Sequence, residues 1–159
     1  MFHQFFPLIP LTLAGALFLK RKSLAYGFPV LLLLVKVLLT QFSVITFFTG
    51  AGLIFSVFLV RQIKNNWGIS VWAVAGYASI SVLIYELMSN LGVWIIGGCV
   101  PHNPPTYAHT FAGLFQCYGA SIPYALRHFF RDVPISVFLI VTISFLSRFD
   151  LNLGKLKRV

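Results

Sequence analysis

The sequence predicts an all-α integral membrane protein, a compact bundle of about six transmembrane helices. Apolar side chains make up 58% of the residues and charged ones only 9%, whereas a soluble domain has roughly a quarter of its residues charged. The apolar residues also gather in runs close to the length of about 20 residues that a bilayer-crossing helix needs. Because the connectors between these runs are short, we expect one membrane-embedded domain over residues 1–159.

The predicted helices follow one another along the chain. The first window, residues 5–19, is followed by Lys20-Arg21-Lys22; a secretory signal has its positive charge before the apolar core, so a retained helix is favoured. Residues 24–40, 42–60 and 68–90 form the next three windows. Residues 107–126 and 133–147 form the last two, with the polar residues 127–132 as their connector.

The net charge of +9 indicates topology rather than nucleic-acid binding, because no basic patch interleaved with aromatic residues is present. Lys and Arg occupy connectors 20–23, 61–67 and 127–132, and are absent around Gln41 and from 89–106. The positive-inside rule then places the first set in the cytosol. Six crossings would put the basic tail outside. Either the tail tolerates this, or the segment around Pro134 does not cross fully, or the orientation is inverted.

One long interruption separates the apolar runs, the stretch "NLGVWIIGGCVPHNPPTY" at residues 90–107. Alternating crossings bring it to the face where the second and fourth helices end, and the less common polar side chains gather there. From these we predict the ligand-binding residues Lys36, Glu86, Asn90, Trp94, His102, Tyr107, Thr110 and Cys117. We expect the stretch to act as a lid over a pocket floored by Glu86, Thr110 and Cys117. A plain connector with Trp and Tyr as interface anchors is the alternative.

Two ionisable residues lie inside apolar runs, which by default points to function or pairing. Lys36 can instead snorkel, since it lies close to the predicted end of its helix. Glu86 shares a helix face with Trp72, Ser79 and Asn90. A pair with Lys36 and a ligand contact are both compatible with its position.

The fifth window carries a polar stripe that should face the bundle interior, either as packing contacts or as a lining. It comprises Thr110, Cys117, Ser121, Tyr124 and His128. The two cysteines, Cys99 and Cys117, are compatible with a disulfide or with free thiols. Together with His102 and His109 they match no short metal-ligand spacing. Since no hydrolase or metalloprotease motif occurs either, we expect no enzyme, no metal and no cofactor.

Three segments carry a resemblance: "FPLIPLTLAGALFLKRKSLAYGFPVLLLLVK", "SNLGVWIIGG" and "PPTYAHTFAGLFQCYGASIPYALRHFFRDVPISVFL". They resemble an uncharacterised family of small bacterial membrane proteins. Asn90, Gly92 and Trp94 match one block of that family. The second block is matched by Thr110, Gly113, Leu114, Cys117, Tyr118, Ile122 and Pro123. The chain departs from the pattern at Pro104-Pro105-Thr106-Tyr107, where a Tyr-Pro is expected, and at Lys36, where relatives carry an acidic residue.

That family is similar in size and helix count to the substrate-binding S components of energy-coupling factor transporters. The resemblance implies a vitamin- or micronutrient-binding component of an uptake transporter in the bacterial cytoplasmic membrane. Its partners would be a membrane coupling subunit, contacted through small residues such as Leu13-Ala14-Gly15-Ala16, and an ATPase. S components keep both termini in the cytosol, opposite to the orientation that the charges favour. The alternative function is a membrane scaffold or assembly protein with no ligand.

Overall fold

The computed structural model describes residues 7–39, 43–96 and 107–156, with side chains up to Ser147 except that of Trp67. These parts form five helices: α1 (Leu8–Phe18), α2 (Lys22–Leu39), α3 (Val44–Trp67), α4 (Val71–Ile96) and α5 (Phe111–Leu156). Four of them, α2 to α5, are long and apolar enough to cross a membrane, and α1 is shorter. The all-helical, membrane-compatible prediction is confirmed, but the described chain has five helices rather than six.

The last two predicted helices are one helix. α5 contains 46 residues, which at 1.5 Å per residue is about 69 Å, roughly twice the thickness of a bilayer core. The connector predicted at 127–132 is therefore wrong, because these residues are helical. Asp132 is only 2% exposed, and Arg131 Nε donates to its Oδ1 at 2.7 Å. Arg131 and Asp132 thus neutralise each other within the helix.

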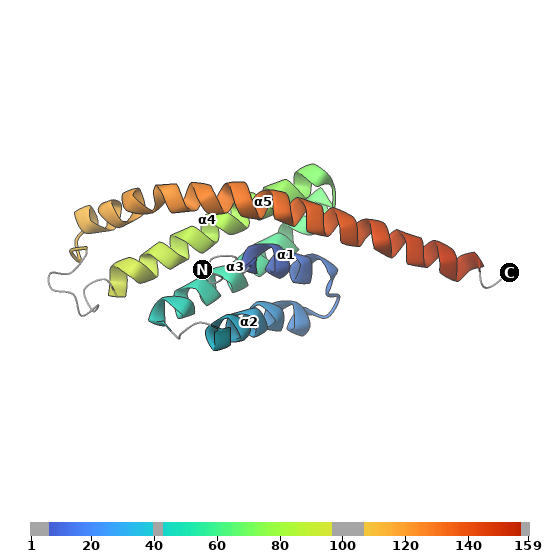
Figure 1. The fold of residues 1–159 in the computed structure, drawn as a ribbon, viewed down its shortest axis with the longest axis horizontal. Coiled ribbons are helices and arrows are strands. Elements are labelled where there is room, and N and C mark those ends of the chain that lie inside the picture. The colour runs from blue at the N-terminus through green and yellow to red at the C-terminus, as the bar shows by residue number, and fades with distance from the viewer. Residues whose placement is uncertain (1–6, 40–42, 97–106, 157–159) are drawn as a thin grey trace.

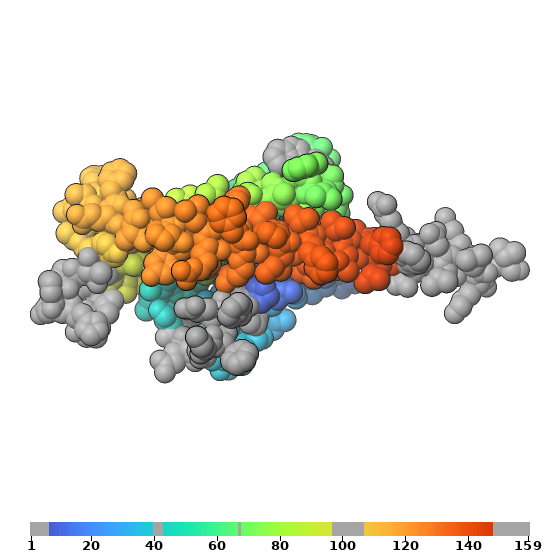
Figure 2. Space-filling model, turned by 45° about the horizontal axis from the view of Figure 1, so that its top comes forward, coloured from blue at the N-terminus to red at the C-terminus, as the bar shows by residue number. Residues whose placement is uncertain are grey.

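The continuous α5 also changes where the chain ends. In Figure 1, α5 starts beside the end of α4, runs along the bundle and projects beyond the loop that joins α3 to α4. Figure 2 shows it as an unbroken ridge across one face. Lys155, near the end of α5, therefore lies toward the same end of the bundle as Lys20 and Lys64. The conflict that six crossings create for the basic tail does not arise with this fold.

The short helix α1 forms the centre of the bundle, because it packs against all four other helices. Most of its residues are buried, including Leu13 and Ala16 at 1% and 2% exposure, as expected for a helix that is apolar on every side. A Cβ at Gly15 would meet the ring of Phe28 on α2. Leu13, Gly15 and Ala16 are thus used for packing inside this chain, and Ala14 is partly exposed.

Basic side chains on α3 hold the end of α1. Arg61 Nη1 donates to the carbonyl of Leu19 at 2.9 Å, and Lys64 Nζ donates to that of Leu17 at 2.5 Å. The last carbonyls of a helix have no partner within it and carry the negative end of its dipole, so cations stabilise them. Two residues predicted only as topology signals therefore also terminate a helix.

At the starts of α3, α4 and α5 single hydroxyl side chains accept hydrogen bonds from backbone amides. The Ser43 hydroxyl accepts from the Ile45 amide at the start of α3, Ser70 from the Ala73 amide in α4, and Thr110 from the Gly113 amide in α5. Such side chains satisfy amides that the first turn leaves without a partner. Between α3 and α4 the chain reverses at Gly68, whose φ of 65° is readily adopted only by glycine.

A candidate ligand groove between α4 and α5

A shallow groove of about 400 Å³ lies between α4 and α5. Apolar side chains make up most of its wall, and Glu86 contributes its single carboxylate. The lining residues are Leu83, Glu86, Leu87 and Asn90 on α4, and Phe115, Tyr118, Gly119, Ser121, Ile122 and Ala125 on α5. A volume of this size is within the range of small-molecule pockets, which combine apolar walls with few polar groups.

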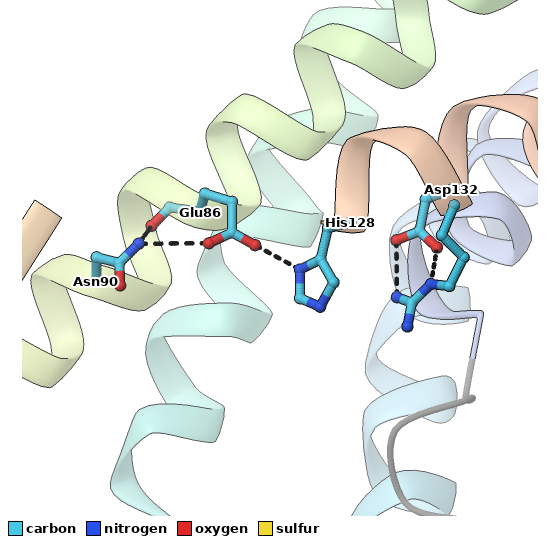
Figure 3. A network of polar contacts seen from close by, with 5 residues as sticks. Glu86, Asn90, His128 and Asp132 are labelled. Carbon is cyan, nitrogen blue, oxygen red and sulfur yellow. Dashed lines mark hydrogen bonds and ion pairs between the residues drawn. The ribbon is translucent and has the colours of Figure 1, made fainter. Parts of the chain in front are cut away.

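Glu86 lies at the centre of a polar network that joins the two helices (Figure 3). Its Oε1 is 2.5 Å from Nδ1 of His128 on α5, and its Oε2 accepts from Asn90 Nδ2 at 3.4 Å. The side chains of Glu86 and His128 are 13% and 28% exposed. A carboxylate at mid-helix is unfavourable in hydrocarbon unless it is paired, and this network supplies the partner.

Asn90 and Cys117 lie beside the groove, where α4 and α5 are in contact. The Asn90 amide also donates to the Glu86 carbonyl at 2.8 Å, and the buried Cys117 thiol lies 3.6 Å from the Asn90 carbonyl. One turn away, Tyr118 donates to the Leu87 carbonyl at 2.8 Å. Cys117 is buried against α4 and is not among the residues that line the groove.

A second ion pair follows the first along α5. Arg131 binds Asp132 through two hydrogen bonds, of 2.7 and 3.1 Å, and Ser136 donates to the Asp132 carbonyl at 2.6 Å. The ring of Tyr85 packs edge-on against His128 at 5.9 Å. Within the parts of the chain that the structure describes, no three His, Cys, Asp or Glu residues come together as a metal site.

The interruption predicted at residues 90–107, for which a lid was expected, begins later in the chain than the sequence indicates. α4 continues to Ile96, so Asn90 and Trp94 belong to the helix. His102 and the rest of residues 97–106 lie outside the described residues. Past that segment, Trp94 Nε1 donates to the Ala108 carbonyl at 3.0 Å and its ring meets that of His109. Trp94 therefore ties the start of α5 to the end of α4, as an anchor does.

The predicted site residues are distributed over three places. Glu86 and Asn90 line the groove, with Cys117 behind it. Trp94, the half-buried Tyr107 and the helix cap Thr110 lie where α4 meets α5. Lys36 is on α2, which packs against α1 and α3. The expected pairing of Glu86 with Lys36 is replaced by the pair with His128.

The two predicted helix faces are partly right. On α4, Glu86 and Asn90 face α5, but Trp72 is 86% exposed. On α5, Cys117 and His128 face the interior, whereas Tyr124 is 62% exposed. Ser121 donates to the Tyr118 carbonyl of its own helix, a local bond that needs no neighbouring helix.

Sequence reasoning placed His128 in a packing stripe and Arg131 with Asp132 in a connector, and so missed both ion pairs. One feature of the sequence could have indicated the second of these pairs. Arg131 and Asp132 are adjacent opposite charges directly before an apolar run. Asp132 is also among the only three acidic residues of the chain. An acidic residue this rare beside an Arg favours a neutralised pair inside a helix as much as a loop.

Comparison with known families identifies the group to which the protein is related. Residues 1–152 match a family of unknown function, DUF6580. The chain belongs to this family. No curated protein and no solved structure matched it. The resemblance inferred from the sequence is therefore supported at the level of an uncharacterised family, and nothing in the comparisons bears on transport.

Proposed function

We propose that this protein binds a small molecule within the membrane, in the groove between α4 and α5. The observation that supports this is Glu86, a carboxylate at mid-helix that lines a groove of about 400 Å³ and is 13% exposed. Ionisable groups at such depth usually belong to functional sites or to pairs. Here the pair with His128 leaves the carboxylate in the wall of the groove.

The form of this function that we propose is uptake of a vitamin or micronutrient across the bacterial cytoplasmic membrane. This extends the analogy with S components, in which a membrane coupling subunit and an ATPase act as partners. The sequence contains no nucleotide-binding loop of the Gly-x-x-x-x-Gly-Lys type. Energy for uptake would therefore come from such partners or from an existing gradient.

A second candidate is a membrane scaffold without a ligand. It is favoured by how the polar side chains between α4 and α5 use their hydrogen bonds. Cys117 and Tyr118 on α5 both contact backbone carbonyls of α4, and polar contacts of this kind hold membrane helices together. On this view Glu86 and His128 are only one more link between the two helices.

Two glycine substitutions distinguish these functions. A Cβ at Gly119, in the groove wall, would meet nothing within 4 Å, and the same is true at Gly27 on α2. Gly119→Leu therefore fills the groove without disturbing the core, while Gly27→Leu is the matched control outside it. Both changes replace glycine in a helix by a better helix former, so neither should reduce stability.

The assay is thermal unfolding of the purified full-length protein in detergent, with a screen of vitamins, nucleobases and metal ions. A ligand at about 100 times its Kd should raise Tm by about 5–10 °C. We expect the same shift in Gly27→Leu and a lost shift in Gly119→Leu. A compound that stabilises Gly119→Leu as well as the parent binds elsewhere. If no compound stabilises the parent, the scaffold is favoured.

A further inference from the structure

The two oxygens of the Glu86 carboxylate have different surroundings. His128, which holds Oε1 at 2.5 Å, is not a lining residue of the groove. Oε2 is the oxygen on the side of Asn90, a lining residue, and their contact is long at 3.4 Å. A carboxylate oxygen accepts more than one hydrogen bond. Oε2 therefore has capacity to accept from a donor that enters the groove.

The rest of the groove wall selects for an apolar body. Four large apolar side chains of the wall are exposed between 55% and 74%: Leu83, Leu87, Phe115 and Ile122. In helices long enough to cross a membrane, exposed apolar side chains face the acyl chains. A molecule that reaches this groove from the bilayer must itself be largely apolar.

The charges near Glu86 favour a cationic ligand over a neutral or anionic one. Glu86 is the single carboxylate in the wall, and no Lys, Arg or His lines it. His128, the basic partner of Glu86, lies on the Oε1 side and outside the groove wall, and Arg131 and Asp132 on α5 are bonded to each other. An anion would be repelled by Glu86, and a neutral donor would gain a hydrogen bond from it without the attraction between opposite charges. Opposite charges attract more strongly in an environment of low dielectric constant than in water.

We propose that the groove binds a lipophilic amine, whose ammonium group pairs with Glu86 Oε2 while its apolar body lies against Leu83, Leu87, Phe115 and Ile122. This inference rests on the proposed function, since it names the chemical class of ligand for the same groove. Phe115 adds a ring face within the wall, and aromatic faces attract ammonium groups.

Three indoles that share a ring but differ in charge test this assignment: tryptamine is a cation, tryptophol is neutral and indoleacetate is an anion. Binding of each to the full-length protein in lipid nanodiscs is measured by calorimetry. We expect tryptamine to bind at least about tenfold more tightly than tryptophol, with indoleacetate weakest. In Glu86→Gln, which keeps the shape of the side chain, tryptamine and tryptophol should bind alike.

Three results would each overturn the proposal: equal binding of tryptamine and tryptophol to the parent, a preference for tryptamine that survives Glu86→Gln, or failure of tryptamine to bind. If Glu86→Gln does not fold, Gly119→Leu takes its place: it must abolish tryptamine binding while Gly27→Leu retains it, and retention in both is a refutation. If tryptamine does not bind but a different compound does, and that compound loses its binding in Gly119→Leu, the amine class is refuted and the groove function stands. If Gly119→Leu weakens no compound, both proposals fail.

Discussion

The ion pair between Glu86 and His128 can be tested by a double-mutant cycle. The perturbations are Glu86→Gln, His128→Leu and the two combined. Removal of His128 leaves a carboxylate with no basic partner in the wall of an apolar groove, whereas Glu86→Gln leaves no carboxylate there and keeps a side chain of the same shape that can still form a hydrogen bond. We therefore expect His128→Leu to destabilise the protein more than Glu86→Gln, and the double mutant to lose less than the sum.

The size of the coupling follows from the geometry. Charge centres about 4 Å apart attract by about 4 kcal/mol at an effective dielectric constant near 20, and desolvation of both groups offsets part of that gain. Both side chains are less than a third exposed, at 13% and 28%, so solvent screens the pair only in part. We expect a coupling energy of about 1.5–3 kcal/mol, the range of hydrogen bonds to charged groups.

The assay is unfolding of the purified protein by SDS in mixed micelles, followed by circular dichroism. Lys36→Met combined with Glu86→Gln is the control cycle. Lys36 lies on α2, which packs against α1 and α3, so these two losses should add within about 0.5 kcal/mol. Additive losses for Glu86 and His128, or a larger coupling of Glu86 to Lys36, would refute the pairing described here.

Three further predictions concern the fold. Arg61→Met should cost about 1–2 kcal/mol by uncapping α1 and should raise amide exchange in Leu8–Phe18; unchanged exchange would show that the cap does not hold this helix. Gly113→Ala should destabilise by about 1–3 kcal/mol, because its Cβ meets the backbone of the preceding turn, whereas Gly119→Ala should be neutral; equal thermal stability of the two variants would argue against this close approach. Single cysteines at Lys64 and near the end of α5, in a background without native cysteines, should both resist labelling from outside the cell, while one at Asn103 reacts; a reactive α5 end would contradict the single crossing of α5.

Composition and apolar runs alone predicted a lipid environment and the approximate positions of α1 to α4. The low charge and long apolar runs require lipid around most side chains, and this does not depend on which helix packs against which. The starts and ends of the helices were not predicted from caps, although they too depend on local sequence. Ser43, Ser70 and Thr110 begin helices because their hydroxyls satisfy amides a few residues away. Gly68 ends one because its backbone conformation is local as well. Glu86 was recognised as exceptional because hydrocarbon penalises any carboxylate, whatever its neighbours.

Only the tertiary structure shows which helices and which side chains are neighbours. Helical periodicity states which residues share a face, but not which helix that face meets, so it could not choose between Lys36 and His128 as the partner of Glu86. The segment 127–132 is compatible with a loop and with a helix, and only the structure shows it as helix, with Asp132 buried and paired with Arg131. α1 is apolar on every side, which suits lipid as well as a protein interior, and only the assembled bundle shows that four other helices surround it.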